Sequence, residues 1–454
     1  MNKIARRSAI SAVLAIILLL GIALFVVRFC LESGKWVVTP GSPHVYEPKN
    51  DEESAVVCGV AVDPKGNLLL DMRDDWTYTK NEALRKANVH WVGDREGNII
   101  APALNTYVYE MTGHDVINGM YSYGDVPSVT YLTLCADIQI AAVEAMGDYR
   151  GTVAVYNYQT GQLLCSVSTN TFDPDNLPET ALDRMYRNNF TEETYIPGSI
   201  FKVVTLAAAL ETIPDVQSRQ FACERTLTVD GNQITCEKLH GVQTLETAFC
   251  NSCNCVFAEL ALEVGAEKMQ EYVQRFGLTE SVRFDGLVSN FGNYSVSAED
   301  EVGLAWSGVG QGEDEIVPCT FLKFIGAVAN GGVPVNPHVV EKITKADRTT
   351  YQAQTAQQVQ ILSPETAETI RGFMRSSALS YDASRFGELT VCAKTGTAQV
   401  EGQTKPNAML TGFVSDPDYP LAFIVCVENA GYGSDIAIPI AQKVLDASKT
   451  YMDN

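Results

Sequence analysis

The first hydrophobic segment of the chain is long enough to cross a membrane. No charged residue occurs from residue 8 to residue 27, and this apolar run follows a short basic segment at residues 1–7. A helix of this length spans about 30 Å, which matches the hydrocarbon core of a bilayer. Val27-Arg28-Phe29 does not provide the small residues of a signal-peptide cleavage site. The pattern predicts a single-pass anchor over residues 8–29 in the cell membrane, with residues 1–7 cytoplasmic and the remainder extracytoplasmic.

The segment after the anchor has a mixed pattern. Residues 55–62 and 67–70 form short strand-like runs that alternate with charged turns. The segment carries no motif to which chemistry can be assigned. We therefore expect residues 30–129 to form a small, non-catalytic N-terminal domain.

The pattern becomes more regular in the last part of the chain, over residues 130–454. Two apolar runs around Thr160-Gly161 predict a β-hairpin, and three further apolar runs near the end predict strands. Segments with helical periodicity lie between and around these strands, so we expect an α+β domain in which helices flank an antiparallel sheet. The expected strands are 151–158, 163–167, 389–392, 409–414 and 421–427, and the main expected helices are 137–146, 203–210, 256–264, 321–329 and 436–452.

Charge restricts the possible partners. The chain of 454 residues has a formal net charge of −22, which argues against nucleic-acid binding. Residues 1–40 carry five basic residues and one acidic residue, so the acidic character belongs to the remainder. This asymmetry fits an acidic globular part that is tethered to a membrane by a basic, apolar N-terminus.

The twelve cysteines do not follow a metal-binding spacing. Cys250, Cys253 and Cys255 lack a second ligand cluster at a suitable spacing, so we expect thiol packing beside a helix, with no metal and no cofactor. Cys223 and Cys236 flank a turn at Asp230-Gly231. They could face each other across two strands, which makes them the candidate pair for a disulfide.

Candidate chemistry begins at Ser199 and Lys202. Pro197 and Gly198 interrupt the backbone before a run of helix-forming residues, so Ser199 is expected in the first turn of a helix. Residues three apart share a helix face, which places the lysine amine beside the serine hydroxyl as a base for a nucleophile. One Ser-x-x-Lys sequence is expected by chance in a chain of about this length, so the pair needs support from elsewhere.

Two further motifs supply that support. Ser252-x-Asn254 and Lys394-Thr395-Gly396 follow Ser199-x-x-Lys202 in order, at separations of 53 and then 142 residues. With these three motifs, the chain resembles the transpeptidase domain of class B penicillin-binding proteins over residues 130–454. Its short segment before that domain is similar to the subgroup called penicillin-binding protein A. The resemblance implies the fold shared by penicillin-binding transpeptidases and serine β-lactamases.

The resemblance also implies roles for the catalytic residues. Ser199 would attack the carbonyl between two D-alanines of a peptidoglycan stem peptide, with Lys202 as its base. Ser252 would relay a proton to the departing D-alanine. Lys394 would supply positive charge that depresses the pKa of Lys202 and attracts the terminal carboxylate of the substrate.

The expected substrate-binding groups surround these four side chains. Asn254 would hold the substrate amide, and Thr395 would donate a hydrogen bond to the terminal carboxylate. Gly396 would let the substrate backbone approach closely, because a side chain there would block docking. The backbone N–H groups of Ser199 and Thr397 would form the oxyanion hole.

The function implied is a membrane-anchored peptidoglycan D,D-transpeptidase that cross-links stem peptides and is acylated by β-lactams. A SEDS-type glycosyltransferase partner is implied by the resemblance alone. The alternatives are a D,D-carboxypeptidase, a β-lactamase, a β-lactam sensor and a non-catalytic scaffold of a cell-wall complex. The sequence offers no clear counterpart of the β-lactamase deacylation base, and the seven residues before the anchor leave no room for a cytoplasmic signalling part.

Overall fold

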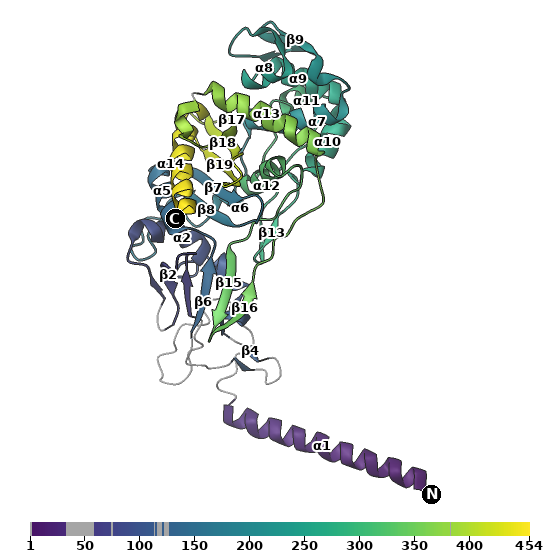
Figure 1. Ribbon diagram of the computed structural model, residues 1–454, viewed down its shortest axis with the longest axis vertical. Helices are drawn as coiled ribbons and strands as arrows, with labels where there is room; N and C mark the ends of the chain where they lie inside the picture. The colour runs from purple at the N-terminus through teal and green to yellow at the C-terminus, as the bar shows by residue number, and fades with distance from the viewer. Residues whose placement is uncertain are drawn as a thin grey trace.

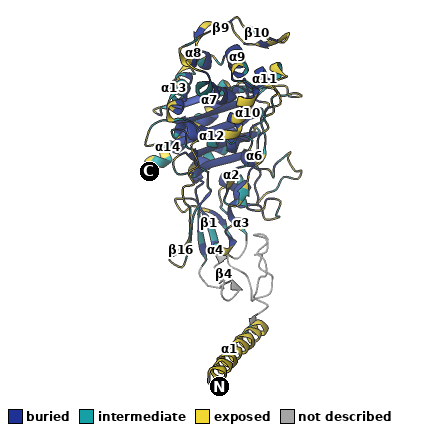
Figure 2. Cartoon of the chain, turned by 90° about the vertical axis from the view of Figure 1, so that its right-hand side faces the viewer, coloured by how far each residue is buried: buried dark blue, intermediate teal, exposed yellow. Residues whose placement is uncertain are grey.

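The computed structural model describes residues 2–32, 59–73, 76–112, 114–115, 120–121, 127–381 and 383–454. Helix α1 (Asn2–Glu32) contains the predicted anchor and is long and apolar enough to cross a membrane. Its apolar window has no area buried within the protein, and Figure 2 shows the helix exposed along its length. Such a helix fits a single-pass anchor, because its hydrophobic side chains have no protein core to cover them.

The N-terminal sheet has six strands in the order β16-β15-β6-β1-β2-β3 (Figure 1). Strands β1 and β6 are parallel, and the other neighbours are antiparallel. Two of the strands come from late in the chain, so the N-terminal region is not built from a continuous segment. The predicted boundary at residue 130 falls within β6. The strands are β1 (Gly59–Val62), β2 (Leu68–Asp71), β3 (Thr77–Tyr78), β6 (Ser128–Leu132), β15 (Val340–Lys345) and β16 (Arg348–Gln352).

Helix α2 (Glu82–Val92) joins this region to the rest of the protein. The Asn81 side chain caps its first turn, and the buried Trp91 donates a hydrogen bond to the carbonyl of Ser166 at 3.0 Å. Arg85 forms an ion pair with Asp173 at 2.6 Å. The other short elements here are α3 (Pro102–Asn105), α4 (Val108–Thr112), β4 (His114–Asp115) and β5 (Met120–Tyr121).

The central sheet is antiparallel throughout, in the order β17-β18-β19-β7-β8. Every residue of β7, β8, β18 and β19 is buried, because helices cover both faces of the sheet. The first strand of this sheet in sequence, β7, pairs with the last, β19. The strands are β7 (Gly151–Asn157), β8 (Leu163–Thr169), β17 (Val391–Ala398), β18 (Asn407–Val414) and β19 (Leu421–Val427).

Two groups of helices sandwich this sheet (Figure 1). Helices α5 (Ala136–Met146) and α14 (Gly433–Asp453) pack together on one face, and α12 (Pro318–Ala329) and α13 (Pro364–Ser380) lie on the other. Nearly all of α12 is buried, since it separates the sheet from a helical region beyond. These layers confirm the α+β fold class.

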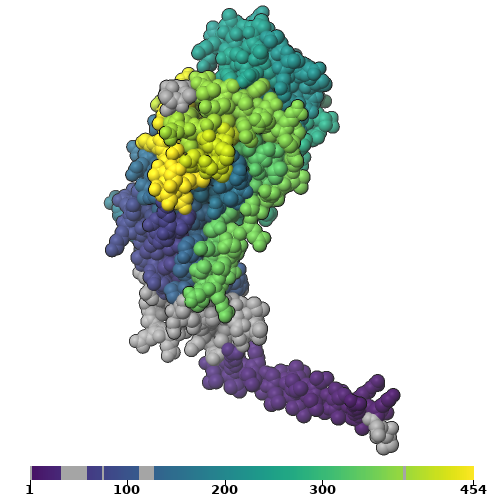
Figure 3. Space-filling model, in the orientation of Figure 1, coloured from purple at the N-terminus to yellow at the C-terminus, as the bar shows by residue number. Residues whose placement is uncertain are grey.

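The helical region forms the end of the protein farthest from β15 and β16 (Figure 3). It carries both residues of the first motif, Ser199 and Lys202, and the whole of the second motif. Its elements, with the remaining short ones, are α6 (Asn189–Glu192), η3 (Gly198–Phe201), α7 (Lys202–Thr212), η4 (Val216–Ser218), β9 (Gln220–Cys223), β10 (Thr226–Val229), β11 (Asn232–Thr235), β12 (Gly241–Thr244), α8 (Leu245–Cys250), α9 (Asn254–Val264), α10 (Ala266–Arg275), β13 (Arg283–Phe284), β14 (Leu287–Val288), α11 (Glu301–Ser307) and η5 (Ala383–Phe386).

The predicted turn at residues 230–231 does join two antiparallel strands, β10 and β11. Cys223, however, ends β9, which pairs with β12, so Cys223 and Cys236 do not face each other across one hairpin. Their sulfur atoms are 3.7 Å apart and both cysteines are free thiols. This separation is well above the roughly 2.05 Å of a disulfide bond, so the predicted pair is close but unbonded.

Candidate active site

Ser199 lies in a tight turn that the strand β17 supports from behind. The turn is the 3₁₀ segment η3, and the α-helix begins only at Lys202. Gly198 has a positive φ of 55°, and a Cβ atom there would lie 2.8 Å from the carbonyl oxygen of Thr397. Its N–H donates to the carbonyl of Gly310 at 2.8 Å, so the glycine-rich segment after α11 buttresses the nucleophile turn.

Lys202 is completely buried, and its amine is the centre of the site. Its Nζ atom lies 2.9 Å from Ser199 Oγ and 3.1 Å from Ser252 Oγ. It also lies 2.7 Å from both the Ser252 carbonyl oxygen and Asn254 Oδ1. The structure therefore brings together the first two motifs predicted from sequence, which are separated by 53 residues in the chain.

These contacts are compatible with a neutral amine that accepts the serine proton. The Ser252 carbonyl and the Asn254 amide oxygen can only accept hydrogen bonds. A neutral amine has two N–H donors for these two acceptors, which leaves its lone pair free for the hydroxyl proton of Ser199. Burial, and secondarily the charge of Lys394, hold the pKa of Lys202 well below its usual value. The arrangement suits a general base.

Ser252 connects the two lysines. Its hydroxyl oxygen lies 3.1 Å from Lys202 Nζ and 3.0 Å from Lys394 Nζ. Lys394 is also buried, its Nζ donates to the carbonyl of Thr395 at 2.9 Å, and burial lowers its pKa to about 7. A hydroxyl between two amines can pass a proton from one side to the other, which is the role predicted for Ser252.

Asn254 also has a structural role that the sequence does not indicate. Its Nδ2 atom donates to the carbonyl of Thr235 at 2.8 Å, which turns its Oδ1 atom toward Lys202. The side chain thus fixes the base as well as lying beside the groove. Ser252, two residues earlier, has a positive φ of 51°, and the sharp turn places its hydroxyl next to the amine.

Tyr381 is a member of the site that the sequence analysis missed. Its hydroxyl lies 3.0 Å from Thr395 Oγ1, accepts a hydrogen bond from the Thr395 N–H at 3.3 Å, and lies 2.7 Å from Ser377 Oγ. The N–H of Thr395 must therefore point away from β18. Because the direction repeats every second residue in a strand, the N–H of Thr397 points outward as well, as an oxyanion donor requires. A lone tyrosine after a helix offers no sequence signal for this role.

Gly396 is required for a reason other than the predicted one. A Cβ atom there would lie 2.9 Å from the Pro197 carbonyl oxygen and 3.0 Å from Ile200 Cγ2. The missing side chain thus makes room for the Ser199 turn, while the prediction placed the close approach on the substrate side. Any substrate contact of Gly396 would come from its backbone.

Burial divides the site into a closed side and an open side. Lys202 and Lys394 are sealed, and the Phe257 and Phe249 rings lie 5.8 Å from their respective amines. Gly396 is buried as well, and the other predicted residues are half-buried: Ser199, Ser252, Asn254, Thr395 and Thr397. A ligand can therefore reach the hydroxyls from outside, while water is kept from the amines that set their reactivity.

Comparison with known proteins agrees with this geometry. Residues 151–446 match the penicillin-binding protein transpeptidase domain family. The peptidoglycan D,D-transpeptidase PbpA of Mycolicibacterium smegmatis is 28% identical over 70% of this chain and 71% of its own length. The stage V sporulation protein D of Bacillus subtilis is 30% identical over 65% of this chain and 48% of its own length.

Solved structures show the same fold. The ceftriaxone acyl-enzyme complex of penicillin-binding protein A from M. tuberculosis superimposes with a TM-score of 0.74, at 23% identity, over 86% of this chain and 97% of that one. The D,D-transpeptidase domain of a peptidoglycan glycosyltransferase from Eggerthella lenta superimposes with a TM-score of 0.71, at 22% identity. The fold, the matched domain and the relatives confirm the resemblance seen in the sequence. The chain belongs to the penicillin-binding protein transpeptidase family, as a class B protein of the penicillin-binding protein A type.

Proposed function

We propose that this chain is a membrane-anchored peptidoglycan D,D-transpeptidase that works through an acyl-enzyme on Ser199. The observation that carries the proposal is the contact of a sealed amine, Lys202, with an accessible serine hydroxyl at 2.9 Å. Relatives named D,D-transpeptidases match over most of the chain and support the same reaction. The distances among Ser199, Lys202 and Ser252 support their roles, and the other roles are those that the family resemblance implies.

Acylation begins when the Ser199 hydroxyl attacks the carbonyl of the D-Ala-D-Ala bond and passes its proton to Lys202. The oxyanion that forms would be held by the N–H groups of Ser199 and Thr397, and removal of one such donor typically costs about 10²–10³ in rate. The proton then leaves through Ser252, whose hydroxyl contacts both lysines, and reaches the nitrogen of the departing D-alanine. An ester on Ser199 remains.

The second step transfers the acyl group to an amine of a neighbouring stem peptide. Lys202 returns to its neutral form when the D-alanine leaves, so it can take a proton from the attacking amine. Thr395 lies at the open side of the site, where it can bind the terminal carboxylate of the donor peptide, and the buried amine of Lys394 beside it supplies positive charge. A β-lactam carries a carboxylate and a reactive amide in a similar relation, so it would acylate the same serine.

An acceptor assay separates transpeptidation from hydrolysis. The full-length chain in detergent is incubated with a stem pentapeptide ending in D-Ala-D-Ala and an excess of a labelled D-amino acid. We expect D-alanine release together with incorporation of the label, and neither product from Ser199→Ala. Release of D-alanine without any incorporation would establish a carboxypeptidase and contradict the proposal.

We also propose that the basic residues before the anchor stay in the cytoplasm, with the catalytic domain on the outer side of the cell membrane. The acidic character of the remainder agrees with this topology. The family resemblance further implies a SEDS-type glycosyltransferase partner, and residues 30–129 would form a small non-catalytic domain. Protease accessibility of the catalytic domain in intact spheroplasts tests the topology, and co-purification from membranes tests the partner.

A further inference from the structure

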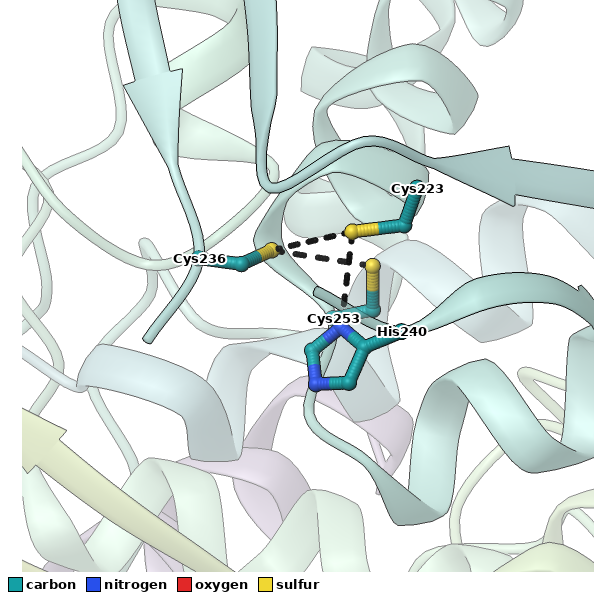
Figure 4. Close-up of side chains that lie close together, drawn as sticks. All are labelled: Cys223, Cys236, His240 and Cys253. Atoms are coloured by element: carbon teal, nitrogen blue, oxygen red, sulfur yellow. Dashed lines mark hydrogen bonds between the residues drawn. The ribbon is translucent and has the colours of Figure 1, made fainter. Parts of the chain in front are cut away.

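Four potential metal ligands converge directly behind the second motif. Figure 4 shows the side chains of Cys223, Cys236, His240 and Cys253 pointing toward a common centre. Their sulfur atoms and one imidazole nitrogen all lie within 4.8 Å of one another. They come from the end of β9, the segment after β11, the residue before β12 and the N-cap of α9. In the sequence Cys253 groups with Cys250 and Cys255, whereas the four-residue set is brought together only by the fold.

Three distances within the cluster match those of a tetrahedral zinc site. Zinc binds cysteine sulfur at about 2.3 Å and histidine nitrogen at about 2.0–2.1 Å, so two sulfur ligands should lie about 3.8 Å apart. The sulfur atom of Cys236 lies 3.7 Å from those of Cys223 and Cys253. A sulfur and a nitrogen ligand should lie about 3.6 Å apart, and Cys223 Sγ lies 3.4 Å from His240 Nδ1.

The surroundings of Cys236 favour a thiolate ligand over simple thiol packing. Its sulfur accepts hydrogen bonds from the backbone N–H of Asn254 at 3.1 Å and of Cys255 at 3.4 Å. Backbone donors of this kind orient a metal ligand and stabilise its negative charge. Thiolate and imidazole together suit zinc, whereas magnesium and calcium prefer oxygen ligands.

A disulfide explains the cluster less completely. It would have to pull two sulfur atoms from 3.7 Å to about 2.05 Å, and it would leave the third sulfur and the imidazole without a function. Zinc would use all four groups with little movement. Cys255 also lies near, with its sulfur 3.5 Å from that of Cys236, but it faces the carbonyl of Ile234 and lies outside the four-residue set.

We propose that Cys223, Cys236, His240 and Cys253 bind one structural zinc ion that holds the second catalytic motif in place. Cys253 is the residue between Ser252 and Asn254, so a metal on its sulfur would anchor the turn that carries both groups. Cys236 follows Thr235, whose carbonyl holds the Asn254 amide. The site would thus tie the β9–β12 ribbon and the β10–β11 hairpin to the start of α9, and it positions residues without contacting substrate.

Metal content tests the proposal directly. The full-length chain is purified in detergent with a reductant, stripped with a chelator, refilled with zinc chloride and dialysed. We expect about one zinc ion per chain by mass spectrometry of the metal, and loss of tight binding in both Cys223→Ser and His240→Ala. Cys255→Ser is the matched control, because it removes a neighbouring thiol outside the set and should keep its zinc. Failure of the wild type to retain zinc, or equal loss in the control, would overturn the site.

Cobalt binding can be measured on the wild-type chain, so this test does not depend on whether a variant folds. Cobalt(II) refilled into the stripped wild-type chain should give the visible absorption of tetrahedral cobalt and the charge-transfer band of thiolate ligands. Their absence would overturn the coordination, as would a Cys223–Cys236 disulfide detected by peptide mass spectrometry in the untreated protein. Loss of the bands in His240→Ala, with retention in Cys255→Ser, would support the assignment.

The positioning role has a separate test. Penicillin should acylate the stripped wild type more slowly than the zinc-filled protein, with recovery when zinc is restored, and His240→Ala should not recover. An acylation rate that does not change on stripping would overturn this role. Because penicillin labelling at Ser199 is scored independently of metal content, failure of the zinc site and failure of the proposed transpeptidase function can be distinguished.

Discussion

The buried amine of Lys394 should make the protein less stable at neutral pH than it would be with an apolar residue. Burial lowers its pKa from 10.5 to about 7, whereas the unfolded chain keeps a protonated lysine. The unfolded state therefore binds more protons, and the penalty is fully present below pH 7 and disappears as the pH rises to about 10.5. At 1.36 kcal/mol per pKa unit, the penalty at pH 7 is about 4 kcal/mol.

Lys394→Met removes the penalty and also removes two hydrogen bonds, to Ser252 Oγ and the Thr395 carbonyl. Each is worth about 1 kcal/mol, which leaves a net gain of about 2 kcal/mol at pH 7. At pH 10 the lysine penalty falls below about 1 kcal/mol, so the variant should become slightly less stable than the wild type. The variant should gain stability but lose acylation activity, because the Lys394 ammonium is no longer present beside Ser252 and the substrate carboxylate.

The assay is thermal unfolding of both full-length proteins in detergent at pH 7 and pH 10, with an exposed-lysine variant, Lys405→Met, as the control. We expect Tm of Lys394→Met to exceed that of the wild type by a few degrees at pH 7, with the order reversed at pH 10. Penicillin acylation of the variant should slow by about 10–100-fold, the equivalent of a charge-assisted hydrogen bond. A Tm difference independent of pH would refute the reasoning, since it would mean that Lys394 titrates as an exposed lysine does.

Three further outcomes are expected. The acylation rate of the wild type should fall as the pH rises through about 7, because Lys394 loses its charge. The rate should also fall at low pH, because Lys202 gains a proton and can no longer act as the base. A flat pH profile in stopped-flow penicillin labelling would contradict both assignments. Gly396→Ala should reduce the acylation rate at least about 100-fold by displacing the serine turn. Gly372→Ala is the control and should keep the wild-type rate, because a Cβ atom at Gly372 meets nothing within 4 Å. Similar rates in the two variants would contradict the packing role of Gly396. Tyr381→Phe should slow acylation by roughly 3–10-fold through loss of about one hydrogen bond, and unchanged kinetics would remove the tyrosine from the site.

Much of the catalytic centre could be predicted from sequence because its three motifs each keep their members close in the chain. Ser199 and Lys202 are one turn apart, and Ser252 and Asn254 flank a single residue. Continuous apolar runs likewise predicted the central strands, and with the helical periodicity between them they predicted the α+β class. Local patterns of this kind survive folding, since neighbours in sequence remain neighbours in space.

Features that depend on contacts between distant segments could not be predicted in this way. The role of Gly396 follows from the carbonyl of Pro197, which lies 199 residues earlier in the chain. The partners of Cys253 in the four-ligand cluster come from three other segments, and their spacing matches no local metal motif. The N-terminal sheet combines strands that precede the catalytic region, the strand β6 at its start and the strands β15 and β16 from its interior, so no single boundary in the sequence marks the sheet.

The most direct test of the account is covalent labelling of the chain by penicillin, followed by intact-protein mass spectrometry. The structure places an accessible Ser199 hydroxyl 2.9 Å from a buried amine, so the wild type should gain the mass of one penicillin per chain. Ser199→Ala should gain none. A wild-type chain that stays unmodified, or a Ser199→Ala chain that is still labelled, would contradict the acyl-enzyme at the centre of this account.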